Sequence, residues 1–218
     1  LWSAGGNWFD DQGNVILNSP EAVEALQFMV DLYQARVTNP QPWANTRDET
    51  QKIFSGGRAA MIPTGNFFVP SLEKNNPDLR YGITAIPANK APGTMAVTDT
   101  LAFFNREGQD KEAVWKFVEF IYERKWREEF MKREGMLPEL KSLADELEKD
   151  PKLGIFIKLL PQARFQPNHE HFMPISQRLV KAVQLALMGE VTPRQALDAA
   201  VEDINKNILK KKQDPTRR

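Results

Sequence analysis

The sequence predicts a helix-rich α/β protein, and three observations support this class. Capped segments with apolar residues at helical spacing fill most of the second half of the chain. Short apolar runs bounded by glycine or proline, as at 59–62 and 81–86, are typical of buried strands. With 218 residues, 41% of them hydrophobic and 27% charged, the composition is that of one large or two small soluble domains.

Charge and composition exclude several kinds of function. The 29 Lys and Arg residues balance the 29 Asp and Glu residues, and a net charge of zero argues against nucleic-acid binding. The absence of cysteine excludes disulfides, thiolate metal sites and cysteine nucleophiles. No apolar run approaches the roughly 20 residues that cross a bilayer, and no signal-peptide pattern is present. Because the sequence opens at Leu1, we expect an N-terminal part, with any export signal, to precede it.

The N-terminal segment is rich in glycine and aromatic residues. Gly5 and Gly6 lie beside Trp2 and Trp8, so a ligand could approach backbone amides while a ring stacks on it. A turn with two half-buried tryptophans explains the same pattern. The polar residues 10–14 have turn chemistry, and their spacing is incomplete for a calcium loop.

Two capped helices are predicted next. Ser19 as N-cap and Pro20 at the first helical position predict a helix start, and Thr46 predicts the cap of a second helix that ends at Phe54. Trp43, in the loop between them, is either a core residue or a ring of a ligand cleft. The first helix has one apolar face, which we expect to be core: Ala22, Leu26, Met29, Val30 and Tyr33.

The central stretch combines a helix end, a turn and two short apolar runs. A helix is predicted to end at Gly56 and Gly57, where glycine can take the left-handed conformation. A buried strand over 59–62, a sharp turn at Gly65 and a second strand over 81–86 are predicted to follow.

A helix is predicted to begin at Asn66, Phe67 and Phe68, directly after the sharp turn. Free N–H groups at a helix N-terminus suit an oxygen-rich ligand, and an aromatic ring there offers a flat apolar face to a sugar. The competing interpretation is core packing. We expect it for one of the two phenylalanines, because they cannot both face the same way.

The middle of the chain is predicted to pass from a linker to a helix. Residues 88–94 are polar and suit a linker, and the second half of 96–104 is predicted to be a buried strand. Asp99 could accept hydrogen bonds from ligand hydroxyls or cap a turn, and both interpretations stay open. Asp110 is expected to cap a helix over 111–123. The apolar stripe of this helix comprises Ala113, Val114, Phe117, Val118 and Ile121.

The remainder is predicted to be helical. Thr192 is the expected N-cap of the last helix, and Lys210 begins a basic, polar end. Four residues are expected to dock the last helix: Leu197, Ala200, Val201 and Ile204. The predicted helices span 124–134, 139–148, 151–161, 174–188 and 193–209.

The sequence contains no motif of a catalytic site. It lacks a P-loop, a G-x-S-x-G elbow and an H-E-x-x-H motif, and no two carboxylates are singled out as a glycosidase pair. His169 and His171, with Glu170 between them, are the only histidines, so we predict neither a metal site nor a cofactor. We therefore expect a protein that is not an enzyme, with a carbohydrate-active hydrolase as the alternative.

Several short motifs follow one another along the chain. The central stretch carries F-x-x-G-x-A-A-M-x-x-x-G, an aromatic residue and then Y-G-x-x-x-x-P. G-x-L-P at Gly135 and G-x-x-T-P-x-x-A-L at Gly189 follow. Together they resemble the extracellular solute-binding proteins of ABC importers (family 1), the group that includes the maltose- and glycerol-phosphate-binding proteins. The central motif is filled by Phe54, Gly57, Ala59, Ala60, Met61, Gly65, Phe67, Tyr81, Gly82 and Pro87.

The resemblance implies the periplasmic-binding-protein-like type II fold, of which this chain would form the C-terminal half. Residues 1–87 and 138–218 would belong to the C-terminal lobe, and 88–137 would be a crossover segment of the N-terminal lobe. The apolar stripe of 111–123 would then be exposed in a monomer. We expect the chain to cover it by self-association, including exchange of 88–136, or by pairing with the remaining half.

The resemblance further implies an ABC-transporter component that captures a carbohydrate or polyol between two lobes and delivers it to a membrane permease. The implied location is periplasmic or extracellular, and a lipid anchor could lie in the preceding part of the protein. An alternative function is that of a binding domain for chemoreception. A phosphorylated solute would need a charge partner, for which Arg58, Arg164 and Arg178 are candidates. The residues expected at the solute site are Trp2, Gly5, Gly6, Trp8, Asn66, Phe67, Thr98, Asp99, His169 and Phe172.

Overall fold

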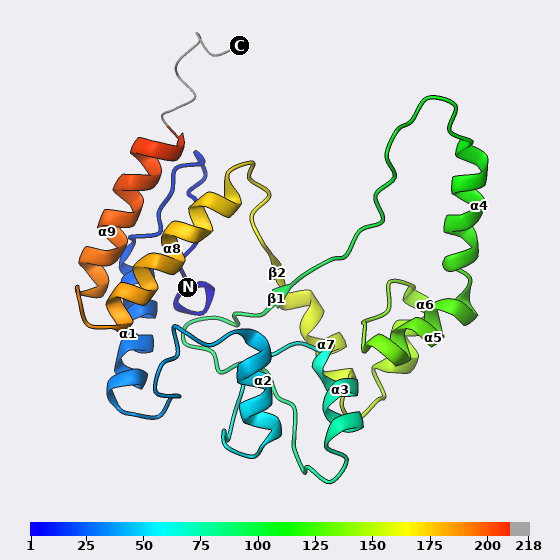
Figure 1. The fold of residues 1–218 in the computed structure, drawn as a ribbon, viewed down its shortest axis with the longest axis horizontal. Helices are drawn as coiled ribbons and strands as arrows, with labels where there is room; N and C mark the ends of the chain where they lie inside the picture. Colours follow the sequence, from blue (N-terminus) through cyan, green and yellow to red (C-terminus); the bar gives the residue numbers. More distant parts are fainter. Residues whose placement is uncertain (210–218) are drawn as a thin grey trace. The chain divides into compact units, whose positions relative to one another are not determined.

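The computed structural model describes residues 1–209, which form two compact units built mainly of helices (Figure 1). Unit 1 comprises Leu1–Asn45, Ile86–Met95 and the chain from Arg164 onward, and unit 2 comprises Thr46–Ala85 and Ala96–Ala163. Within the described part of the chain, no helix is long and apolar enough to cross a membrane. The basic end predicted from residue 210 lies outside the described residues.

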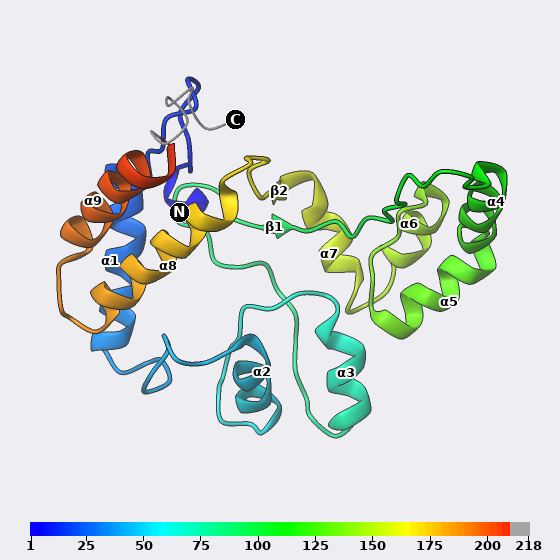
Figure 2. The ribbon, with the colours of Figure 1, turned by 45° about the horizontal axis from the view of Figure 1, so that its top comes forward.

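Three long helices dominate unit 1: α1 Pro20–Gln34, α8 Phe172–Leu187 and α9 Pro193–Ile204. They pack against one another, and Figures 1 and 2 show them side by side in blue, yellow-orange and orange-red. A short 3-10 helix, η1 Trp2–Ala4, precedes α1, and a wider helical turn, η3 Asn205–Leu209, continues α9.

The core of unit 1 confirms most of the predicted apolar faces. All four residues expected to dock the last helix are buried. Ala22, Leu26 and Val30 of α1 form one cluster with Leu197, Ala200 and residues of α8, whereas Val201 and Ile204 belong to a second cluster. Met29 is an exception, because its side chain is 45% exposed on the flank of α1, beside the buried row. Trp43 packs edge-on against Tyr33, with ring centroids 5.1 Å apart, and is partly buried against the core, which favours the core interpretation.

Helices begin where the sequence predicts side-chain caps. Ser19 Oγ accepts the backbone N–H three residues on at 3.3 Å, and Asp110 Oδ1 does the same at 3.0 Å. Thr46 and Thr192 each form a full capping box with the residue three positions later. These contacts are local, which is why the sequence predicts them well.

Unit 2 contains most of the shorter helices. Its contacts join α3 to α5, α4 to α5, and α6 to α7. The C-cap of α5 is Gly135, at φ 64°. The helices are α2 Arg47–Ser55, α3 Phe68–Asn75, α4 Lys111–Ile121, α5 Arg124–Glu134, α6 Lys141–Leu147, α7 Gly154–Leu159 and η2 Leu160–Gln162.

The predicted strands are wrong. Residues 59–62 and 81–86 have no regular secondary structure, and neither does the second half of 96–104. Among the described residues, the only sheet is the pair β1 Met95–Ala96 and β2 Arg164–Phe165. A strand is stabilised by hydrogen bonds to a neighbouring strand, so an apolar run that has no such neighbour among the described residues gains nothing from being extended.

The apolar stripe predicted for the helix over 111–123 is exposed in part: Ala113 and Phe117 are exposed, whereas Val114, Val118 and Ile121 are half-buried. No side chain of α4 is buried, and Phe117 is 53% exposed. Figures 1 and 2 show the segment between β1 and α4 as an extended trace. We call these exposed residues of α4 and of the segment before it the α4 apolar face: Leu101, Phe103, Phe104, Phe117 and Phe120. The predicted assignment of 88–137 to another lobe stays a prediction.

Candidate functional site

Aromatic side chains from the N-terminal segment meet the loop before α8 in unit 1. The rings of Trp8 and Phe172 have centroids 5.0 Å apart and are tilted by 47°. Phe9 stacks on the imidazole of His169 at 4.9 Å and 17°. We call these four residues the aromatic cluster: Trp8, Phe9, His169 and Phe172.

A tight turn positions the N-terminal part of this cluster. Asp10 Oδ1 accepts the backbone N–H groups of Gln12 at 3.0 Å and Asn14 at 2.7 Å. Hydrogen bonds from the side chain and backbone of Asn14 lower the pKa of Asp10. The turn folds the chain back so that Phe9 bridges Val15 in antiparallel fashion, and Val15 is buried in the core. The predicted turn chemistry is confirmed.

The glycine pair is explained by packing. Gly5 adopts φ 88° and ends η1, and its N–H donates to the carbonyl of Trp2 at 3.0 Å. The N–H of Gly6 donates to the carbonyl of Leu1 at 3.2 Å, and a Cβ on Gly6 would lie 3.0 Å from Glu21 Cβ. Both amides are already engaged within the segment, so the structure favours the turn interpretation, and a ligand role for either glycine stays a prediction.

His169 organises the start of α8. Its Nδ1 accepts the backbone N–H of His171 at 3.1 Å, and its carbonyl accepts that of Phe172 at 2.9 Å. The imidazoles of His169 and His171 are 5.8 Å apart, and Nε2 of His171 lies 3.8 Å from a carboxylate oxygen of Glu170. Within residues 1–209, no group of three or more His, Asp or Glu side chains is placed to hold a metal ion.

In unit 2, the two phenylalanines at the start of α3 differ as predicted. Phe68 is buried, with 7% of its surface exposed, whereas Phe67 is 41% exposed. The guanidinium carbon of Arg47 lies 5.1 Å from the ring centroid of Phe67. Gly65 lies against the same ring, and a Cβ at this position would collide with it. The glycine therefore permits the position of the exposed ring.

The other predicted residues of unit 2 have different surroundings. Asn66 Nδ2 donates to the carbonyl of Gly135 at 2.5 Å, so two of the sequence motifs meet here. Thr98 and Asp99 are exposed in the segment after β1, and their side chains make no hydrogen bond to another residue of the described chain.

The structure thus divides the predicted site residues between the two units. Sequence reasoning missed Phe9, although its place beside Trp8 was a usable signal, and it missed Arg47, for which the sequence holds no signal. Unit 1 contains Trp2, Gly5, Gly6, Trp8, His169 and Phe172, and unit 2 contains Asn66, Phe67, Thr98 and Asp99.

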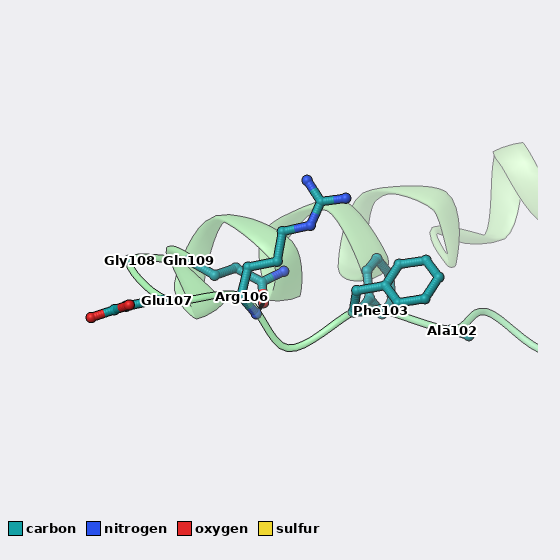
Figure 3. Close-up of a pocket in the computed structure, with 7 residues that line it drawn as sticks. Ala102, Phe103, Arg106, Glu107, Gly108 and Gln109 are labelled. Carbon is teal, nitrogen blue, oxygen red and sulfur yellow. Dashed lines mark hydrogen bonds between the residues drawn. The ribbon is translucent and has the colours of Figure 1, made fainter.

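A hollow in unit 2 contains none of these residues. It is lined by residues of the loop before α4, among them Phe103, Arg106 and Gln109 (Figure 3). In Figure 3, Glu107 points away from Phe103. Ligand sites usually combine apolar walls with a few polar groups that converge on one point. One turn of a single loop does not provide that arrangement, so we assign no ligand to this hollow.

Partly exposed aromatic rings with polar groups at their edges are typical of a site that binds a small solute. The chain belongs to the bacterial extracellular solute-binding proteins, whose family model matches residues 1–128. The predicted resemblance is therefore confirmed.

Relatives in sequence and in structure agree with this family. A binding protein of Brucella abortus (strain 2308) is 32% identical over 207 residues, which are 93% of this chain and 50% of the relative. An ABC-transporter solute-binding protein of Thermotoga lettingae TMO, bound with alpha-D-tagatose, is 25% identical with a TM-score of 0.79 over 94% of this chain and 54% of its own.

A second solved structure is the cyclic alpha-maltosyl-1,6-maltose binding protein of Arthrobacter globiformis. It is 25% identical with a TM-score of 0.71 over 94% of this chain and 52% of its own. The chain therefore spans about half the length of these relatives. The predicted periplasmic-binding-protein-like fold class is confirmed. The prediction that this chain is rich in helices is confirmed as well.

Proposed function

We propose that this chain supplies part of the solute site of an ABC-transporter binding protein, and that the solute is a carbohydrate or polyol. The observation that carries the proposal is the aromatic cluster, in which Trp8 meets Phe172 and Phe9 meets His169. Flat rings suit the C–H face of a sugar, and the polar edges of Trp and His suit its hydroxyls. The sugars named for the Thermotoga and Arthrobacter relatives support this class of solute.

In this proposal, the solute is held between two lobes, of which this chain forms a part. A solute that binds the closed arrangement better than the open one drives closure. The closed protein then delivers its solute to a membrane permease from the periplasmic or extracellular side. The protein itself is either free in that compartment or attached to the membrane by a lipid anchor. The protein releases the sugar unchanged and is not an enzyme.

Saccharide titration of the 218-residue chain tests the proposal. Saturation-transfer NMR with neutral sugars and polyols detects weak binding, and product analysis detects turnover. Trp8→Ala is expected to weaken binding about three- to tenfold, the usual value of one aromatic contact. Phe28→Ala is the matched control, because Phe28 is an exposed aromatic residue of α1, outside the cluster. Hydrolysis of the sugar, or equal effects of the two variants, would contradict the proposal.

We also propose that the chain self-associates through the α4 apolar face. Isolated exposed apolar side chains are common, whereas several large ones within one stretch of the chain, as here between residues 101 and 120, favour a surface that another polypeptide covers. Sedimentation velocity at increasing protein concentration is expected to show species larger than the monomer. Phe117→Ser should shift the distribution toward monomer, and Phe28→Ser should not. A wild-type chain that stays monomeric throughout would refute this part of the proposal.

A further inference from the structure

Cationic side chains lie over several aromatic rings of the described residues, and one of these cations differs from the rest. Four of them also form an ion pair with a carboxylate: Arg47, Lys125, Arg127 and Lys152. The fifth is Arg164, whose guanidinium carbon is 5.9 Å from the ring centroid of Trp2. Within residues 1–209, the exposed side chain of Arg164 has no ion pair and no hydrogen bond to another residue.

The backbone holds Arg164 in place although its side chain is unpaired. Arg164 begins β2, and its N–H donates to the carbonyl of Thr94 at 2.9 Å. Thr94 directly precedes β1, which pairs with β2. The backbone of Arg164 therefore has a fixed register, and its guanidinium lies over the ring of Trp2.

The partner ring is held by the same part of the chain. Ser3, next to Trp2, accepts the N–H of Asn89 on Oγ at 2.9 Å and the N–H of Lys90 on its carbonyl at 2.8 Å. The indole N–H of Trp2 donates to Asn7 at 3.4 Å. Residues 89–94 therefore connect the ring to the strand that carries the arginine.

The other arginines considered as charge partners are less suitable. Arg178 pairs with Asp203, so its charge is already compensated. Arg58 lies in unit 2, outside the aromatic cluster, and stacks on none of the rings expected to bind solute. Lys90, close to Gly5, is paired with Glu24 at 2.6 Å. Arg164 is thus the cation of unit 1 that lies over a ring expected to bind solute. Its five guanidinium N–H donors form no hydrogen bond to any of residues 1–209.

We infer that the solute is an acidic saccharide, with a carboxylate or phosphate that Arg164 binds beside the ring of Trp2. The inference rests on the proposed saccharide function and narrows it. A guanidinium presents a planar fork of donors that matches two oxygens of either anion, and the neighbouring indole provides an apolar face for the sugar ring.

Paired titrations of the 218-residue chain test this inference. Glucose, glucuronate and glucose 6-phosphate differ only in the group at one end of the sugar, so the two acids distinguish carboxylate from phosphate. At least one acid is expected to bind about tenfold or more tightly than glucose, the usual advantage of a charge-assisted hydrogen bond. Added salt should reduce the advantage, because the site is exposed.

Two arginine variants locate the effect. Arg164→Gln should remove the preference for the acid, so that glucose and the two acids bind with affinities within about twofold of one another, and the variant should fold because the side chain is exposed. Arg36→Gln, which removes an exposed arginine elsewhere in unit 1, should keep the preference. Circular dichroism verifies that both variants fold.

Each outcome decides the inference. Binding of glucose as tightly as of both acids overturns the inference and leaves the proposed saccharide function standing. A preference that survives in Arg164→Gln also overturns it. Absence of binding by all three sugars, and by the neutral panel, overturns both.

Discussion

The adjacent phenylalanines at the start of α3 provide a matched test of stability against binding. Phe68 is 7% exposed, so Phe68→Ala removes a buried ring and leaves a cavity. Such changes usually lower the free energy of unfolding by about 3–5 kcal/mol. Phe67 is 41% exposed, so its ring is a little more than half buried. Full burial of such a ring stabilises a fold by roughly 1.5–3 kcal/mol, and we expect Phe67 to contribute a little more than half of this. With a weak contact to Arg47, the expected cost of Phe67→Ala is about 1–2 kcal/mol.

Urea unfolding followed by far-UV circular dichroism measures both costs, and saccharide titration measures binding. Phe68→Ala should lower the unfolding midpoint by at least twice as much as Phe67→Ala. Under the proposed function, Phe67→Ala should weaken saccharide binding about three- to tenfold, because the exposed ring is the one available for stacking.

Two results would refute this reasoning. Equal losses of unfolding free energy in the two variants would show that α3 does not bury Phe68 in solution. Weakened binding in Phe68→Ala at temperatures where it stays folded, without weakening in Phe67→Ala, would show that the exposed ring does not contact the solute.

Three further predictions concern single positions. Gly135→Ala should lower the unfolding free energy by about 1–3 kcal/mol in urea titrations, because φ is 64° and the new Cβ would lie 2.7 Å from α3. Thr192→Ala removes a capping box and should cost about 1 kcal/mol in the same assay, and an unchanged midpoint would contradict it. Hydrogen bonds from Asn207, and to a lesser extent from Arg178, lower the pKa of Asp203. The ionised carboxylate therefore stabilises the folded state above the ordinary carboxyl pKa, and this contribution disappears as pH falls through the lowered value. Asp203→Asn should therefore lower the thermal midpoint at neutral pH and flatten its acid dependence, and an unchanged pH profile would refute this.

Local interactions explain why the helices could be predicted from the sequence. Ser19, Thr46, Asp110 and Thr192 cap helices through contacts only three residues long. The strand predictions were wrong because strands depend on distant rather than local contacts. An apolar run such as 59–62 becomes a strand only when another segment pairs with it, and the run itself holds no information about that partner.

The candidate site shows the same difference between local and distant contacts. The residue types that suit a sugar were visible in sequence, including Trp8, His169 and Phe172. The contacts were not, because Trp8 meets Phe172, and Phe9 meets His169, across most of the chain. The glycine pair had two interpretations in sequence, and the structure favours packing.

By itself, the sequence determined where helices form, the starts of those with side-chain caps, most of the apolar faces of α1 and α9, and the motifs that mark the family, because periodicity, caps and motifs are properties of neighbouring residues. Only the tertiary structure decided which phenylalanine at α3 is exposed, which rings pack together, and which arginine lies beside Trp2 with no ion pair to any of residues 1–209. These outcomes depend on contacts between residues far apart in the chain, and such contacts exist only once the chain has folded.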